Sequence, residues 1–375
     1  MKQQVVIGLG FGDEGKGLVT DWLCSQAQNA NKTPAVIRFS GGHQVGHNVV
    51  LPSGKSHIFS NFGSGTLRGV PTFWMAKTID PIAIVNETIV LDEKGVQPVR
   101  LYAHPHTPIT TFMEKERNQY VEQSRGDKSH GSVGVGFGKT IEREKNNYHL
   151  YLQDIFYPEI FERKLGAIRD YYSSRLGHHL WQERSTREGH LRDALEILPR
   201  VITPTWSIPP SETLIYEGSQ GLLLDMDYGV FPHVTYSRLG TQEIEVTPET
   251  EYYLVTRAYQ TRHGRGFMSS FSYEPHNPEE TNIHNDWQGE FRTAVLDLDM
   301  LNYSLSIDRN IDQSTNKNIV ITCLDQMTEW SVVYKGKKIL LRSEEEWLHF
   351  VVDRLPEANI YVSHGPTAEN ITRWK

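Results

Sequence analysis

Short apolar runs alternate with stretches of helical spacing along most of the chain. Residues 5–7, 35–39 and 319–322 are runs rich in Val and Ile, which are typical of strands buried on both faces of a parallel sheet. Apolar residues at three- and four-residue spacing predict helices at 18–23 and through most of 150–200, and a further apolar helix is predicted at 295–305. This alternation predicts an α/β fold in which a central, mostly parallel sheet is flanked by helices.

A long polar stretch of helical character interrupts this alternation in the middle of the chain. We expect residues 105–210 to form a mostly helical insertion, and residues 127–140 within it to form a mobile glycine-rich loop that orders over an anion. A plain flexible linker fits the composition of this loop equally well. Because the sequence contains no internal repeat, low-complexity tract or clear linker, residues 1–375 are predicted to form one large domain.

Residues 8–17, with the sequence GLGFGDEGKG, lie between the first predicted strand and the first predicted helix. A glycine loop in this position aims backbone amides and a helix N-terminus at phosphate oxygens. It differs from a standard P-loop, because Gly17 replaces the Ser or Thr that would hold magnesium after Lys16. A dinucleotide fold is disfavoured, because the next strand does not end in the required acidic residue. The pattern predicts a phosphate loop with its own carboxylate, Asp13, beside its own lysine.

Polar, glycine-rich segments follow several other predicted strands. They are GGHQVGH, GSQG, TRHGRG and SHGP, at residues 41–47, 218–221, 261–266 and 363–366. In open α/β sheets ligands bind at the carboxyl ends of the strands, so we expect these segments to line one shared site. The two histidines of the first segment favour chemistry over a purely structural role, since imidazole can donate a proton where small residues let a ligand approach.

Composition limits the kinds of binding partner and the cellular compartment that we expect for this protein. A net charge of −8 over 375 residues indicates neither a nucleic-acid surface nor an acidic-membrane surface. Two cysteines make no disulfide framework, and the sequence has no signal-like segment and no apolar run of about 18 residues, so we expect a cytoplasmic protein. The pairs His104/His106 and His178/His179 lack the spacing of a helical metal site and are interpreted as surface histidines.

Taken in order, the motifs resemble those of the adenylosuccinate synthetase family over nearly the whole chain. They are GDEGKG, GGHxxGH, GxQG with LLDxDxG, VT, TRxGxG, LD and SxGP, at 12–17, 41–47, 218–229, 234–235, 261–266, 324–325 and 363–366. The resemblance implies the fold of that family and a ligase that joins L-aspartate to C6 of a purine nucleoside monophosphate. The implied route is a 6-phosphoryl intermediate formed by transfer from a purine triphosphate, with Mg²⁺ as the cofactor.

The resemblance also implies roles for individual residues. Asp13 would take the N1 proton of the purine and bind Mg²⁺ together with the backbone carbonyl of Gly42, while His43 would stabilise charge on the transferring phosphoryl group. The residues implied for the triphosphate are Gly12, Glu14, Gly15, Lys16, Gly17, Asp325, Ser363, Gly365 and Pro366. Those implied for the monophosphate are Ser132, Arg143, Gln220, Thr235 and His263.

A homodimer is a further implication, because members of this family insert an arginine across the subunit interface. Arg143 is the candidate for that arginine, and Lys145 is the alternative.

The aspartate loop departs from the family pattern. The usual TTGRRRRTGWLD corresponds here to IHNDWQGEFRTAVLD, which keeps only Arg292 of the arginines. A dicarboxylate still needs cations, so Arg292 would act with Arg262 or Arg265. The residues expected to bind aspartate are Arg292, Asn285 and Gln288.

The donor-base motif departs as well, because the usual TKLD is TCLD here. Asp325 is kept, but Cys323 replaces the lysine that covers the base, so ATP or dATP is plausible as the donor beside GTP. Both departures resemble the phage branch that makes 2-aminodeoxyadenylosuccinate from dGMP and aspartate for 2-aminoadenine DNA, which would place the protein in a host cytoplasm. Some members of that branch carry Ser in place of Asp13, so ordinary synthesis from IMP and GTP stays open. We prefer dGMP.

Two other classes of function stay open. A catalytically inactive nucleotide sensor is disfavoured by Asp13, Lys16 and His43, since a binding protein needs no base. A generic P-loop ATPase is disfavoured by Gly17.

Overall fold

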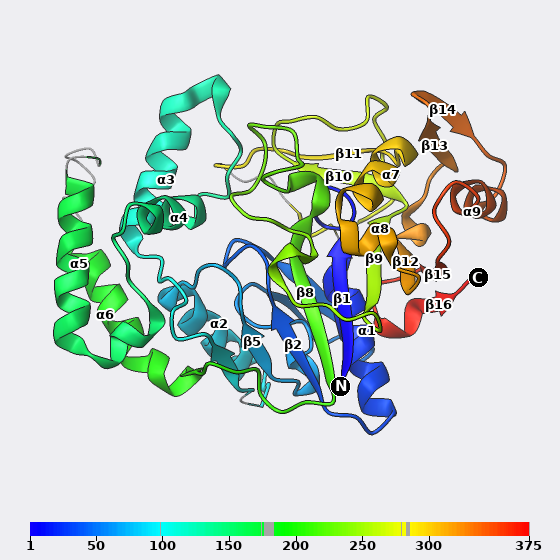
Figure 1. Ribbon diagram of the computed structural model, residues 1–375. Helices are drawn as coiled ribbons and strands as arrows, with labels where there is room; N and C mark the ends of the chain where they lie inside the picture. The colour runs from blue at the N-terminus through cyan, green and yellow to red at the C-terminus, as the bar shows by residue number, and fades with distance from the viewer. Residues whose placement is uncertain (98, 174, 176–183, 279, 283–285, 375) are drawn as a thin grey trace.

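The central sheet has ten strands in the part of the chain that the computed structural model describes, namely residues 1–97, 99–173, 175, 184–278, 280–282 and 286–374. The strand order is β16-β15-β12-β9-β1-β8-β2-β5-β6-β7, and all neighbours are parallel except β15 and β16 (Figure 1). The strands are β1 Lys2–Gly8, β2 Pro34–Arg38, β5 Thr72–Trp74, β6 Leu101–Ala103, β7 Ile202–Pro204, β8 Thr213–Gly221, β9 Glu251–Arg257, β12 Lys317–Thr322, β15 Asn359–Ser363 and β16 Ile371–Arg373. The predicted α/β fold with a mostly parallel sheet is confirmed.

β1 lies in the middle of the sheet, and its alternating side chains enter two different cores. Val5 and Ile7 pack in one core with residues of α7 Leu298–Ile307, α8 Arg309–Gln313 and α9 Glu344–Val352. Val6 packs in the other core with residues of α1 Lys16–Asn29. Both faces of the strand are therefore buried, which explains its continuous run of apolar residues.

A helical region separates β6 from β7 in the sequence, although these two strands are neighbours in the sheet. It forms the left side of the molecule in Figure 1 and contains α3 Phe112–Arg125, α4 Phe137–Lys145, α5 Pro158–Ser173 and α6 Arg184–Val201. α6 packs against α2 Pro81–Glu93 over a third apolar core. Among the described residues, no helix has both the length and the apolar character needed to cross a membrane.

Three small antiparallel hairpins are found elsewhere in the described residues. They are β3 His47–Val50 with β4 Ser56–Phe59, β10 Tyr259–His263 with β11 Phe291–Val295, and β13 Ser331–Tyr334 with β14 Lys337–Leu340. The β10–β11 hairpin lies beyond the carboxyl ends of the central strands (Figure 1). It thereby carries the TRHGRG segment over the same edge of the sheet as the phosphate loop.

Two local predictions were wrong. The helix expected at 295–305 begins later, because Val295 pairs with Tyr259 in the hairpin and the Asp297 side chain caps α7 by accepting from the amides of Asp299 and Met300. The GSQG segment is not a loop after β8 but its last four residues, and only a short 3₁₀ turn, Leu222–Leu224, follows it.

Candidate active site

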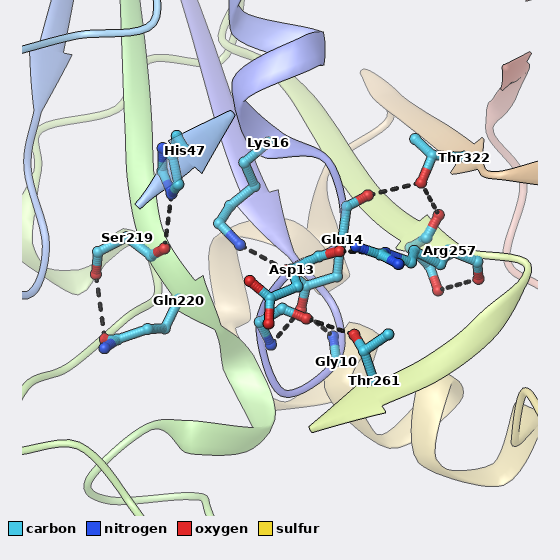
Figure 2. Close-up of polar contacts among 12 residues, drawn as sticks. Gly10, Asp13, Glu14, Lys16, His47, Ser219, Gln220, Arg257, Thr261 and Thr322 are labelled. Atoms are coloured by element: carbon cyan, nitrogen blue, oxygen red, sulfur yellow. Dashed lines mark hydrogen bonds and ion pairs between the residues drawn. The ribbon is translucent and has the colours of Figure 1, made fainter. Parts of the chain in front are cut away.

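The phosphate loop joins β1 to α1 and is held by side chains from three neighbouring strands (Figure 2). The carbonyls of Gly12, Asp13 and Glu14 accept hydrogen bonds one after another. The donors are Thr261 Oγ1 at 2.9 Å, Arg257 Nε at 2.5 Å and Thr322 Oγ1 at 2.7 Å, respectively. Two of these donors lie on β9 and β12 of the central sheet and the third lies on β10 of the β10–β11 hairpin, so the sheet and the hairpin together fix the path of the loop.

Asp13 adopts a left-handed backbone conformation with φ of 60°. This conformation is uncommon for a residue with a side chain, and it stores strain when the surrounding structure enforces it. The enforcement here is the hydrogen bond from Arg257 to its carbonyl, together with the bonds to the carbonyls on either side.

Glu14 points into the loop rather than out of it. Its Oε1 accepts from the amides of Gly10 at 3.0 Å and Gly12 at 2.8 Å, and its Oε2 pairs with Lys16 Nζ at 2.5 Å (Figure 2). A Cβ on Gly8 would lie 2.3 Å from this carboxylate. The glycines of the motif thus make room for a buried carboxylate, as well as for a phosphate.

The carboxylate of Asp13 faces His263 of β10, with Oδ2 3.3 Å from the ring Nε2. Burial alone would raise the pKa of Asp13, but the hydrogen bond and charge of His263 and the charges of Arg257 and Lys16 outweigh it and lower the pKa. Burial would lower the pKa of His263, but its bond to Asp13 raises it. Asp13 is therefore held as a carboxylate beside two cations of the loop region.

A cavity of about 610 Å³ opens over the loop, and a second of about 200 Å³ adjoins it. Asp13 and Lys16 line the larger one. The two cavities share part of their lining, which consists of Phe11, Gln44, Val133, Gln220, Leu224, His263 and Gln288. The space therefore extends continuously from the phosphate loop to the glycine-rich segment after α3.

Most residues expected to contact the triphosphate line the larger cavity. These are Gly12, Gly15, Lys16, Gly17, Asp325, Gly365 and Pro366. Glu14 and Ser363 are buried instead, and the Ser363 hydroxyl donates to the carbonyl of Gly365 at 2.9 Å. Cys323 also lines this cavity, in a left-handed conformation with φ of 63°.

Four of the five residues expected to contact the monophosphate line the smaller cavity, namely Ser132, Gln220, Thr235 and His263. Arg143 lines neither cavity in this structure. Its side chain is 0% exposed and forms ion pairs with Glu114 at 3.2 Å and Glu144 at 3.0 Å. Reaching a phosphate or a second subunit would require breaking both pairs. The alternative, Lys145, is exposed, and its ammonium lies 4.8 Å from the ring centre of Tyr236, beside the smaller cavity.

His43 is buried, and both of its ring nitrogens have partners. Nδ1 is 2.9 Å from Thr78 Oγ1, and Nε2 is 3.0 Å from the carbonyl of Val135 in the glycine-rich segment. Burial lowers its pKa, so the ring is held neutral. Since a carbonyl only accepts, the proton of this imidazole lies on Nε2, and Nδ1 accepts from Thr78.

His47, the second histidine of the segment, is tied to the end of β8. Its Nδ1 is 2.5 Å from Glu217 Oε1, and its Nε2 is 2.9 Å from the carbonyl of Ser219. Burial would raise the pKa of Glu217, but Arg38 and His47 bring it down to about 2. This buried pair fixes the GGHQVGH segment against the strand that carries Gln220.

The arginines expected to bind aspartate are engaged with the backbone. Arg262 donates to the carbonyls of Arg265, Phe267 and His233, and its guanidinium lies 4.3 Å from the ring centre of Phe11. Arg292 donates to the carbonyls of Gly264 and Gly266 at 2.7 and 3.0 Å. Both arginines therefore brace the hairpin in this structure.

The remaining predictions for aspartate and for histidine pairs have mixed outcomes. Gln288 lines both cavities, whereas Asn285 lies outside the described residues, as do His178 and His179. His104 and His106 lie beside Trp206, with ring centres 4.7 and 4.9 Å from it.

The Asp13 carboxylate fits a magnesium ion, which takes oxygen ligands and needs one or two carboxylates in addition to substrate phosphates, whereas Gly42 lines neither cavity. Asp13 is ionised and lines the cavity beside Lys16, where donor phosphates would lie. In the described part of the chain, no cluster of three or more His, Cys, Asp or Glu side chains could hold a metal. The protein alone therefore supplies few ligands, as this ion allows.

Arg257, Glu280 and Asn282 are site residues that the sequence did not reveal. Arg257 lies at the end of β9 and contacts Asp13, all three line the larger cavity, and none belongs to a glycine-rich segment. For Arg257 the available signal was its position four residues before the start of the TRHGRG segment.

Comparisons with known proteins agree with this arrangement. A family model described as adenylosuccinate synthetase matches residues 5–340. The adenylosuccinate synthetase of Nitrosospira multiformis is 31% identical over 282 residues, covering 71% of this chain and 63% of the relative. That of Pseudomonas fluorescens is 32% identical over 283 residues, covering 71% and 64%. The chain spans less than two thirds of the length of these curated relatives.

Solved structures share the fold. The fully ligated adenylosuccinate synthetase of Plasmodium falciparum superposes with a TM-score of 0.76 at 16% identity, covering 100% of both chains. The succinoaminodeoxyadenylate synthetase of cyanophage S-2L, solved with dGMP and dATP, gives a TM-score of 0.66 at 14% identity, covering 99% and 95%. With the family model matched over most of its length and these relatives beside it, the chain belongs to the adenylosuccinate synthetase family.

Proposed function

We propose that the protein is a ligase that joins L-aspartate to C6 of a purine nucleoside monophosphate. The observation that carries this proposal is the place of Asp13, an ionised carboxylate in the larger cavity, paired with a histidine that lines both cavities. A triphosphate over the loop and a purine in the adjoining cavity would meet at this carboxylate. Such transfers depend mainly on positioning and electrostatics, which a preformed loop supplies.

The proposed reaction has two steps. Asp13 accepts the N1 proton of the purine, O6 attacks the γ-phosphorus of the donor, and a nucleoside diphosphate leaves. The amino group of aspartate then attacks C6, the C6–O6 bond breaks, and inorganic phosphate leaves with the O6 oxygen and with the proton that the amino group gives up. Lys16 and the N-terminus of α1 stabilise the donor phosphates, once Lys16 leaves Glu14. Bound Mg²⁺ would neutralise phosphate charge beside Asp13.

We propose dGMP as the preferred monophosphate, giving 2-amino-2'-deoxyadenylosuccinate. The support lies in the arginines of the hairpin, because Arg262 and Arg292 are occupied by five backbone carbonyls between them. A family loop rich in arginines can contact the ribose, whereas this one has few cations left for a 2'-hydroxyl. The likeness to a fold solved with dGMP is consistent with this choice.

IMP is the second candidate, and two observations favour it. Asp13 is retained, and the curated relatives are adenylosuccinate synthetases of bacteria. With dGMP, the proposed donor is ATP or dATP, since Cys323 lies near Asp325 in the larger cavity, where the family has a lysine. With IMP, the proposed donor is GTP.

A product assay tests the proposal and separates the two substrates. Purified protein is incubated with Mg²⁺, aspartate and ATP, dATP or GTP, with dGMP or IMP in separate tubes, and the succinyl adduct is identified by mass spectrometry. Adduct from dGMP with ATP or dATP supports the first candidate, and adduct from IMP alone rejects it in favour of the second. Phosphate release without any monophosphate would instead indicate an ATPase.

We also propose that the enzyme acts as a homodimer in which Lys145, rather than Arg143, is the cation that approaches the monophosphate of a partner subunit. Exposure of Lys145 and burial of Arg143 support this choice. If Lys145→Ala leaves the KM for the monophosphate unchanged, this assignment fails.

A further inference from the structure

A closed circuit of hydrogen bonds surrounds Asp13. Arg257 donates through Nε to the Asp13 carbonyl at 2.5 Å, and its Nη1 lies 3.3 Å from Glu280 Oε2. The other oxygen of Glu280 accepts from the amide and side-chain nitrogens of Asn282, at 3.0 and 2.7 Å. Asn282 Oδ1 in turn lies 3.2 Å from His263 Nε2, which returns to Asp13 Oδ2 at 3.3 Å.

The chemistry of the acceptors fixes the direction of the last two bonds. A carboxylate oxygen and an amide oxygen both accept, so Nε2 of His263 carries a proton shared between Asp13 and Asn282. The ring is held on its other side by Phe291, with ring centres 5.0 Å apart. The histidine is thus a fixed donor rather than a freely rotating one.

The circuit links two elements that are far apart in the sequence. Asp13 lies in the phosphate loop, and residues 280–282 lie in the segment between β10 and β11. Both Glu280 and Asn282 line the larger cavity, as do Arg257 and His263. A ligand in that cavity would therefore touch the circuit as well as Asp13 itself.

We propose that Arg257 and His263 are positioning residues for Asp13, and that Glu280 and Asn282 couple them. Arg257 holds the backbone of Asp13 in its left-handed conformation, and His263 aims one oxygen of the carboxylate, which leaves the other free for the purine. The inference rests on the proposed function, since it concerns the base of that reaction. It differs from the monophosphate contact expected for His263, because the histidine acts here through Asp13.

The physical reason is the demand for precise placement. A displacement of about 1 Å at a reacting group can lower a rate by about 100-fold. A carboxylate on a strained backbone has no intrinsic preference for the productive orientation, so its partners must supply one. Two donors, one on the carbonyl and one on the carboxylate, restrict both the backbone and the side-chain torsions.

The test uses paired variants of each residue in the full-length protein. His263→Val removes the donor, and His263→Gln restores an N–H on a side chain of similar reach. Arg257→Met removes the side-chain hydrogen bonds to Asp13, Glu280 and Tyr259, whereas Arg257→Lys keeps a single donor. His190→Gln and Arg192→Met, both on α6 far from the cavities, are the matched controls.

Turnover supplies the first readout, with the monophosphate that the wild type accepts. We expect His263→Val and Arg257→Met to lower kcat by about 10- to 100-fold while the KM for the monophosphate stays within about threefold. His263→Gln should recover most of the loss. Unchanged kcat in His263→Val overturns the inference, and so does a raised KM with unchanged kcat, which would assign the histidine to monophosphate binding.

Hydrogen exchange of the peptide covering residues 10–17 supplies a second readout that does not require activity. Exchange should be faster in Arg257→Met and His263→Val than in the wild type, and unchanged in the two α6 controls. If the two variants exchange faster but the wild type makes no adduct, the proposed function is rejected and the positioning circuit is kept. Normal exchange and normal kcat in an active enzyme would reject the circuit alone.

Discussion

The ion pair between Glu14 and Lys16 gives a quantitative test of how the phosphate loop is built. The side chains of Glu14 and Lys16 are 4% and 2% exposed, and their charged atoms are 2.5 Å apart. Removing one partner of a buried pair typically costs about 3 to 5 kcal/mol, because it leaves the other charge without compensation. Glu14→Gln keeps an acceptor for the amides of Gly10 and Gly12 but leaves the Lys16 ammonium unpaired. We expect a loss of about 3 kcal/mol in the free energy of unfolding.

Lys16→Met should cost less, about 2 kcal/mol, because the Glu14 carboxylate keeps two amide donors. The double variant should lose less than the sum of the single variants, with a coupling energy of about 1 to 3 kcal/mol. The three variants and the wild type are compared by equilibrium urea unfolding. Glu212→Gln is the matched control, since the pair Lys32–Glu212 has a similar distance of 2.8 Å but is about half exposed. That variant should lose much less stability than Glu14→Gln, because solvent screens an exposed pair.

Additivity would refute the reasoning. If the losses of Glu14→Gln and Lys16→Met add to within about 0.5 kcal/mol in the double variant, the two charges do not stabilise each other. The inward direction of Glu14 would then be irrelevant to stability, and the close approach of Gly8 to this side chain would need another explanation.

Three further outcomes are expected. Asp13→Ala should lower kcat by about 10² to 10⁴-fold and keep triphosphate binding, as measured by product formation and calorimetry, whereas a nucleotide sensor would show no turnover to lose. The pKa of Glu217 is lowered to about 2, so its stabilisation is complete above pH 4.5 and is lost as the pH falls towards 2. Unfolding at each pH should show Glu217→Gln about 3 kcal/mol less stable than the wild type near neutrality, with the gap closing in acid. Cys323→Lys should raise the GTP-to-ATP ratio of kcat/KM by about tenfold, since the donor-base pocket regains a cationic stem over the base.

The strand ends of the sheet could be predicted from the sequence because their signals are local. The apolar run before the phosphate loop, the glycines within it and the helix after it are contiguous, so their pattern alone predicts the unit. The larger cavity lies where those ends meet, and residues far apart in sequence, such as Lys16, Gln220 and Asp325, line it together. The convergence follows from parallel pairing, which brings the carboxyl ends of strands to one edge.

The directions in which individual side chains point could not be predicted from such local patterns. Asp13 and Glu14 are adjacent and chemically alike, but one faces the cavity and the other faces the interior of the loop. The difference comes from the left-handed backbone at Asp13, which depends on Arg257 and Thr261 from other strands. A choice made by tertiary contacts has no signature in the motif itself.

Burial of charged residues escaped prediction for a related reason. Arg143 lies in a polar helical stretch that reads as an exposed face, yet its side chain is fully buried between Glu114 and Glu144. The partners come from α3 and α4, which pack against each other. A sequence shows that charges are present, and only the fold shows which of them neutralise each other.

The phosphate loop and the histidine beside it differ in how ready they are for a substrate. The loop is braced from outside by three strand ends and from inside by Glu14, so its backbone is preformed. His43 is not preformed for a substrate in this way, because its only ring proton is donated to the carbonyl of Val135. Under the proposed function His43 would stabilise a transferring phosphoryl group, and it would have to release that carbonyl first. The proposal therefore predicts that the segment carrying Val135, which lines the smaller cavity, shifts when substrates bind, whereas the loop that carries Asp13 need not.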